Sequence, residues 1–208
     1  MREWIVQGGP VLWALLVVSV LAVFVFLNKL LQLHRAQIHS RDFLDGIYNV
    51  LRRGNAVEAV TICEDTPGPV AQLVRAAILQ VDDNPEEMSK AIQHAGLAEI
   101  PRLEHRLNLL ATLGKIAPML GLLGTVLGFI QVFVDMQRTY PATYPSALAG
   151  GMGAALLTTA VGLTIAIPIY AGYNLLVSRI EALVLDMEYA AAEIYSFLIR
   201  NRALFTKD

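Results

Sequence analysis

Three threonines stand in stretches of the sequence that carry no charge. Thr125 lies in the run 116–134, and Thr158 and Thr159 lie in the run 139–178. In a helix, a threonine hydroxyl can donate to the carbonyl three or four residues back, which satisfies it at little cost. Polar groups buried at membrane depth also often line an ion path, where hydroxyl and carbonyl oxygens suit a proton carrier or a hard cation. The threonines therefore indicate either helix packing or the wall of a hydrated pore.

Small residues recur around these threonines at a spacing of four. On a helix, residues four apart share a face. Because lipid is as apolar as leucine, helices in a bilayer associate through close van der Waals approach, which small side chains permit. We therefore expect two spanning helices to pack closely against other helices, in the wall of any pore that they form, through Gly121, Gly124, Gly128, Gly150, Ala154 and Gly162.

The composition places the chain in a membrane. Of its 208 residues, 55% are hydrophobic and 16% are charged, which is too apolar for an ordinary soluble domain. A crossing needs roughly 20 mostly apolar residues, and three runs meet or approach this requirement: 11–27, 116–134 and 139–178. A cleaved signal peptide is the alternative for the first run. No small-residue cleavage site follows that run, so we expect it to remain as a spanning helix.

Lysine and arginine near the ends of the runs predict the orientation. They cluster after the first run, before the second and after the third, whereas the connection between the second and third offers only Arg138. The positive-inside rule then puts the N-terminus in the periplasm and the C-terminus in the cytoplasm. The predicted all-α organisation is an outer interfacial segment with the first transmembrane helix over 1–33, a cytoplasmic helical region over 34–105, the second transmembrane helix over 106–136, a periplasmic connection over 137–146, the third transmembrane helix over 147–180, and a cytoplasmic C-terminal helix over 181–208.

The cytoplasmic region shows amphipathic helical spacing. Apolar residues predict one helix that ends at Gly54-Asn55, a second from Ala56 to about residue 66, and a third over 70–81. Asn84 is placed to cap a fourth helix. We expect that helix to run almost unbroken into the second span, with a kink at Pro101.

The apolar runs also lack a group that an ion-driven protein needs. Neither 116–134 nor 139–178 contains an ionisable side chain apart from tyrosines. A protein that gates protons or sodium ordinarily needs a carboxylate at membrane depth. If the chain conducts ions, the carboxylate must therefore come from a partner.

Other chemistry finds little support in the sequence. Cys63 is the single cysteine, so one chain can build neither a disulfide nor a cysteine metal site. The four histidines lack ligand spacing. The sequence shows no nucleophile–base–acid set, no phosphate-binding loop and no basic stripe for nucleic acid. We therefore expect no enzyme activity, no cofactor, no metal site and no nucleic-acid partner.

Two membrane segments carry a resemblance to a known family. The stretch 114–130, GKIAPMLGLLGTVLGFI, resembles the second-span signature of the MotA/TolQ/ExbB proton channel family. Residues 154–168, followed by Tyr173-Asn174, resemble its third-span signature. The stretches 8–13, 51–63 and 69–79 are similar to ExbB-like proteins. Three spans with one large loop after the first favour the ExbB and TolQ branch, since MotA-type stators have four.

The resemblance implies a specific assembly in the bacterial inner membrane. A homopentamer would surround the single-span helices of an ExbD- or TolR-like dimer, whose membrane aspartate takes up and releases a proton or a sodium ion. The resulting motion would act on a TonB-like protein, as in TonB-dependent import, or on the envelope. Thr125 and Thr159 match the family's two pore hydroxyls.

One position departs from the ExbB and TolQ pattern. Ala154 stands where those proteins usually have a glutamate, and the reading Met-x-x-Ala-Leu-Leu-Thr-Thr is closer to some MotA-like and sodium-driven stators. A MotA-like or gliding-type stator subunit is therefore one alternative. An alternative of another class is an oligomeric membrane scaffold that packs through its glycine rows and conducts nothing.

Overall fold

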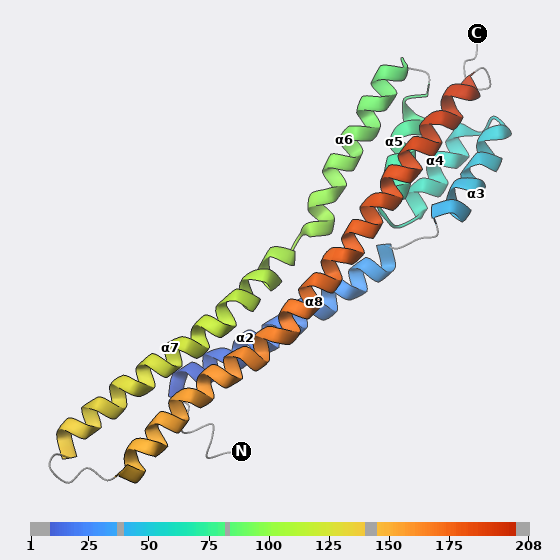
Figure 1. The fold of residues 1–208 in the computed structure, drawn as a ribbon. Helices are drawn as coiled ribbons and strands as arrows, with labels where there is room; N and C mark the ends of the chain where they lie inside the picture. Colours follow the sequence, from blue (N-terminus) through green and yellow to red (C-terminus); the bar gives the residue numbers. More distant parts are fainter. Residues whose placement is uncertain (1–8, 37–39, 82–83, 140–144, 203–208) are drawn as a thin grey trace. The chain divides into compact units, whose positions relative to one another are not determined.

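The computed structural model describes residues 9–36, 40–81, 84–139 and 145–202, and the regular structure of these residues is helical (Figure 1). This confirms the predicted all-α class. The outer segment before residue 9 and the connection 140–144 lie outside the described residues. The helices are α2 (Gly9–Ala36), α3 (Ser40–Arg52), α4 (Ala56–Asp65), α5 (Pro69–Leu79), α6 (Pro85–Glu104), α7 (Leu107–Thr139) and α8 (Pro145–Arg200).

Three stretches contain helices long and apolar enough to cross a membrane, namely Pro10–Arg52, Pro85–Arg138 and Ala149–Arg200. Large apolar side chains remain exposed along them, including Phe24, Phe133 and Ile167 at 63%, 63% and 69%. Such surface is stable against lipid or another protein chain. The 56 residues of α8 measure about 84 Å at 1.5 Å each, which exceeds the roughly 30 Å hydrocarbon layer. The prediction of three helices able to span a membrane is therefore confirmed, and α8 is longer than one crossing requires.

The chain divides into two compact units. Unit 1 consists of Met1–Lys29 and Arg106–Leu175, and unit 2 consists of Leu30–His105 and Leu176–Asp208. Helices α2 and α8 contribute residues to both. The core of unit 1 brings the three spanning helices together through Val11, Leu15, Ala117 and Ala166, with Val18, Leu120, Val161 and Ile165 packed against them.

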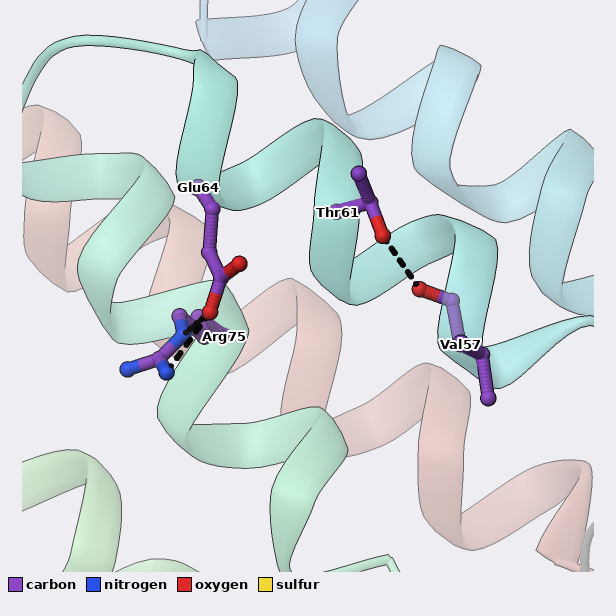
Figure 2. Close-up of polar contacts among 4 residues, drawn as sticks. All are labelled: Val57, Thr61, Glu64 and Arg75. Carbon is purple, nitrogen blue, oxygen red and sulfur yellow. Dashed lines mark hydrogen bonds and ion pairs between the residues drawn. The ribbon is translucent and has the colours of Figure 1, made fainter.

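Unit 2 holds the shorter helices, in which α4 packs against α3 and α5, and α5 packs against α6. Within this unit the aromatic rings of Tyr48 on α3 and Phe197 on α8 stack, with their centroids 4.3 Å apart. Figure 2 shows the surface of α4 and α5, where Arg75 pairs with Glu64 at 2.8 Å. Both partners are partly exposed, so this pair adds only about 0–1 kcal/mol.

The turns of unit 2 follow the sequence closely, with one difference in detail. Asn55 caps α4, since its side chain accepts from the Glu58 amide at 3.3 Å. Asn84 occupies the cap position of α6, but its side chain makes no capping hydrogen bond. Instead its backbone carbonyl accepts from the amides of Glu87 and Met88 at 2.9 and 3.1 Å.

The segment that we expected to continue almost unbroken, with a kink at Pro101, is interrupted at residues 105–106. Helix α6 contains Pro101 and ends at Glu104, and α7 begins at Leu107. Between them, Arg106 adopts a φ of +69°. A left-handed residue ends a helix because it turns the next carbonyl away from the helix axis. The interruption therefore falls after the proline and divides the segment into two helices.

Gly68 offers a first test of the fold of unit 2. Its φ is +130°, and a Cβ built there would lie 2.8 Å from the backbone oxygen of Ala36. Gly68→Ala is expected to lower the free energy of unfolding by about 1–3 kcal/mol, because alanine is strained in that backbone region. Gly46→Ala is the matched control, since open space surrounds that helical glycine and alanine favours a helix by about 0.5–1 kcal/mol. Thermal unfolding of the purified protein in detergent measures both, and equal melting temperatures for the two variants would contradict this expectation.

Cys63 gives a second test. The thiol is fully buried on α4, and burial raises its pKa from 9.0 to about 12. Because the folded pKa lies above the unfolded one, the neutral thiol stabilises the fold below about pH 9, and this contribution is lost as the pH rises toward 12. Iodoacetamide at neutral pH is expected to leave Cys63 unlabelled until the protein is denatured, as mass spectrometry would record. Rapid labelling of the folded chain would show that the site opens.

Candidate functional site

The candidate site lies where α7 and α8 come closest in unit 1. A Cβ built on Gly162 would lie 2.8 Å from the Ala117 oxygen and 2.9 Å from the Gly121 Cα. A Cβ built on Gly121 would lie 3.0 Å from the Thr158 oxygen and 3.2 Å from the Gly162 Cα. The two glycines therefore bring the helix backbones into contact, which larger side chains would prevent.

This close approach brings the three threonine hydroxyls to two backbone carbonyls. Thr159 donates to the Gly121 oxygen at 3.0 Å across the helix pair. Thr158 donates to the Ala155 oxygen at 2.7 Å within its own helix. Thr125 lies within 3.2 Å of both carbonyl oxygens and also contacts the Thr159 hydroxyl directly. The result is a hydroxyl cluster, Thr125, Thr158 and Thr159, that spans α7 and α8.

The members of the hydroxyl cluster differ in accessibility. Thr158 is only 3% exposed. Its side chain fills the space beside Gly124, where an added Cβ would lie 2.5 Å from the Thr158 Oγ1. Thr125 and Thr159 are half-buried. Within one chain, therefore, Thr158 belongs to the packed contact between the helices, while Thr125 and Thr159 retain a face that a further element can reach.

The residues of the predicted wall also divide into two groups. Gly121, Gly124 and Gly162 are buried, and Gly128 approaches Ala155, so that a Cβ there would lie 2.6 Å from the alanine Cβ. Gly150, in contrast, has open space around it within the chain, and Ala154 is half-buried. The first group packs α7 against α8, and the packing role of Gly150 and Ala154 in an oligomer stays a prediction.

Two contributors to the site were not singled out from the sequence. They are the backbone oxygens of Gly121 and Ala155, which accept the hydroxyl hydrogen bonds. Because a backbone acceptor exists at every residue, only the helix crossing shows which ones are used. The four-residue spacing of Gly121 and Thr125 was the available signal, since it puts both on one face of α7.

The site offers neutral oxygen ligands and no charge of its own. Hydroxyl and carbonyl oxygens suit protons carried on an acid, and they also suit hard cations. Among the residues that the structure describes, no group of three or more histidine, cysteine or acidic side chains is placed to hold a metal ion.

Comparison with known proteins places this arrangement in a family. Residues 66–189 match the model of the MotA/TolQ/ExbB proton channel family. The chain is 30% identical over 174 residues to the biopolymer transport protein exbB1 of Vibrio cholerae, covering 82% of this chain and 76% of that protein. It is 25% identical over 214 residues to the biopolymer transport protein ExbB of Neisseria meningitidis, covering 94% and 96%. It is 39% identical over 123 residues to the Tol-Pal system protein TolQ of Haemophilus influenzae, covering 57% of this chain and 54% of that protein.

The matched region contains both α7 and the membrane half of α8, and therefore the hydroxyl cluster. Its relatives include both ExbB and TolQ proteins, which are transport proteins and not enzymes. The chain is thus a multi-pass membrane protein that belongs to the MotA/TolQ/ExbB proton channel family, as an ExbB/TolQ-like channel subunit of a biopolymer transport system.

Proposed function

We propose that this chain is the ion-conducting subunit of an inner-membrane energy transducer, in which the hydroxyl cluster receives the acidic helix of a partner protein. The partner is an ExbD- or TolR-like dimer with a single membrane span per chain. Its aspartate carries a proton, or a sodium ion, past the half-buried Thr125 and Thr159. The coupled motion drives work at the envelope, such as TonB-dependent import.

The observation that carries this proposal is the convergence of three hydroxyls on the carbonyls of Gly121 and Ala155 in an otherwise uncharged helix pair. Two of those hydroxyls remain partly accessible in one chain. We assign the pore-facing role to Thr125 and Thr159 and the packing role to Thr158, because Thr158 is 3% exposed. Family membership adds the expectation of a partner that supplies the acid.

The charge state of the partner aspartate supplies the driving force. An unpaired carboxylate in an apolar interior costs several kcal/mol, and binding a proton or a sodium ion removes most of that cost. The ionised and neutral states of the partner helix therefore prefer different positions along the pore wall. Ion flow down its gradient repeatedly switches the helix between these positions.

Five copies of the chain would enclose the partner, with α7 and α8 of each copy toward the centre. The N-terminus would lie in the periplasm and the C-terminus in the cytoplasm, as lysine and arginine near the ends of the apolar runs indicate. Gly150 and Ala154, which face open space or are half-buried in one chain, would then pack against neighbouring copies or the partner.

Co-purification and flux measurements test the proposal. The chain is expressed with the single-span protein encoded beside it, the copies of each are counted by native mass spectrometry, and proton flux into proteoliposomes is followed with a pH-sensitive dye. We expect flux only from the complex, and we expect loss of flux when the partner's membrane aspartate is replaced by asparagine. A complete complex without flux would favour the non-conducting scaffold.

Sodium is tested in the same proteoliposomes, since Thr158 and Thr159 add neutral oxygens and Ala154 contributes no fixed charge. Flux and activity at constant proton-motive force are compared with and without external sodium. Insensitivity to sodium would assign the proton as the coupling ion.

A further inference from the structure

A pocket in unit 1 lies among the three spanning helices. Its volume is about 310 Å³, at the lower end of the roughly 300–1,000 Å³ of pockets that hold small ligands. Its lining consists of four residues of α2 between 19 and 26, Leu110 of α7, and five residues of α8 between 164 and 172. All of these residues belong to unit 1, so the pocket is a feature of one compact unit.

The floor of the pocket is closed and its mouth is open. Ala22, Leu110 and Ile169 form the floor, since they are 2%, 1% and 8% exposed. Val23 is 55% exposed and Thr164 is also exposed, so these two lining residues lie at the mouth. A molecule outside the protein can therefore enter the space.

A contact between α2 and α8 bounds the pocket on one side. The Phe26 ring packs on Gly172, where an added Cβ would lie 3.0 Å from two ring carbons. Both residues line the pocket. The pocket is therefore a recess beside a tight helix contact and not a general separation of the two helices.

The mouth of the pocket faces hydrocarbon. The lining residues of α2 fall within the uncharged run 11–27, and those of α8 fall within the uncharged run 139–178. Their neighbours in the sequence are large exposed apolar side chains, such as Val20 at 60%, Phe24 at 63% and Ile167 at 69%. Such runs lie in the lipid layer, where no water is present to fill a recess. The molecule that enters the mouth is therefore a component of the bilayer.

The chemistry of the lining selects the neutral part of such a molecule. None of the ten lining residues is charged, and their polar side chains are the hydroxyls of Ser19 and Thr164. The Thr164 hydroxyl already donates to the Ala160 oxygen of its own helix at 2.8 Å. A charged headgroup in this pocket would lose its water without gaining an opposite charge. The pocket therefore suits a hydrocarbon chain and not a headgroup.

We propose that this pocket holds one acyl chain of a membrane lipid, with the headgroup outside. Lipid is as apolar as the pocket wall, so transfer from water does not select the occupant. An empty pocket, however, leaves its lining atoms without van der Waals partners, and a chain that fills the space restores those contacts. The inference rests on the membrane crossings and is independent of ion conduction and of the partner.

Photolabelling of the full chain tests this binding directly. The protein is reconstituted with phosphatidylcholine that carries a diazirine on one acyl chain, extracted into detergent, washed free of loosely held lipid, and irradiated. Mass spectrometry of its peptides locates the label. We expect label on the lining residues of α2 and α8 and none on Phe133 of α7, which is 63% exposed outside the pocket. Phosphatidylglycerol with the same labelled chain is expected to give the same result, because the lining is uncharged.

Three variants separate the pocket from the rest of the apolar surface. Val23→Trp fills the mouth and is expected to reduce labelling of the α8 lining by at least about fivefold, which corresponds to about 1 kcal/mol. Val23→Ala cannot block the mouth and is expected to keep the label. Val17→Trp is the matched control, since Val17 is 53% exposed on α2 and does not line the pocket. Its labelling is expected to equal that of the unaltered chain.

Several results would overturn the assignment. Absence of label from the pocket, or equal label on Phe133, would show that the pocket does not retain a chain. Equal losses in Val23→Trp and Val17→Trp would reduce the effect to added bulk on α2. A strong preference for one of the two headgroups would show that the chain does not govern binding.

Two further measurements separate this inference from its alternatives. A change in the number of chains per particle in Val23→Trp, counted by native mass spectrometry, would show that a neighbouring copy covers the pocket. A complex that conducts ions without lipid in the pocket would refute this inference and leave the proposed function standing. A chain that retains lipid in the pocket but conducts no ions with its partner would do the reverse.

Discussion

Gly162→Leu is expected to abolish the packing of α7 against α8. The new Cβ would meet the Ala117 oxygen at 2.8 Å and the Gly121 Cα at 2.9 Å, and these are backbone atoms that no change of rotamer can move. Inserting a larger side chain into a packed core usually lowers the free energy of unfolding by about 1–3 kcal/mol. A clash with the backbone of a spanning helix is expected to cost at least the upper value of this range. We expect little folded protein in the membrane fraction, as size-exclusion chromatography of a detergent extract would record.

Gly153→Leu is the matched control for this substitution. Gly153 is on the same helix and meets nothing within 4 Å within the chain, so the leucine is expected to leave the single-chain fold intact. Gly150→Leu, in equally open space, tests the contact between copies of the chain. If Gly150 packs between copies as proposed, its variant keeps the fold and loses the oligomer. Normal accumulation of Gly162→Leu would refute the close approach of the helices.

The double variant Thr125→Val, Thr159→Val is expected to reduce ion flux by roughly tenfold or more. Valine keeps the shape of threonine but removes the hydroxyls, and a hydrogen bond to a charged group is worth about 1.5–3 kcal/mol. The free energy of unfolding is expected to fall less, because a hydrogen bond between neutral groups contributes about 1 kcal/mol. Flux in proteoliposomes containing the partner gives the first effect, and thermal unfolding gives the second.

Two single variants locate the cause of that loss. Thr164→Val removes an exposed hydroxyl of α8 that donates to the Ala160 oxygen at 2.8 Å, and flux is expected to stay unchanged. Thr158→Val removes the buried hydroxyl, and we expect a loss of stability with a smaller loss of flux. A larger loss of flux in Thr158→Val than in the double variant would reverse the roles assigned to the hydroxyl cluster.

The helices of unit 2 could be predicted because residues next to their ends determine where each helix begins or stops. Gly54 has a φ of +76° after α3, Asn55 caps α4, and Pro69 and Pro85 begin α5 and α6. Each signal acts within a few residues, through a missing amide, a capping oxygen or a permitted positive φ. The break at Arg106 carried no such signal, because arginine is not a residue that ordinarily takes a left-handed conformation.

The packed face of α8 could not be predicted from its spacing alone. Two neighbouring four-residue rows, one through Gly150 and Ala154 and one through Gly151 and Ala155, were equally small. The structure buries Ala155, Thr158 and Gly162, a stripe that passes from the second row to the first. It changes row because a helix has 3.6 residues per turn, so a straight contact uses steps of three and four.

By itself, the sequence determined that this protein crosses the membrane three times, that its spans carry hydroxyls among small residues, and that its apolar runs supply no acid. Those properties follow from the composition, because a segment that lies in the hydrocarbon layer must be about 20 residues long and mostly apolar. Only the tertiary structure decided that Thr158 is enclosed while Thr125 and Thr159 stay accessible. Adjacent residues on a helix point about 100° apart, and which of them faces the neighbouring helix depends on where the two backbones cross.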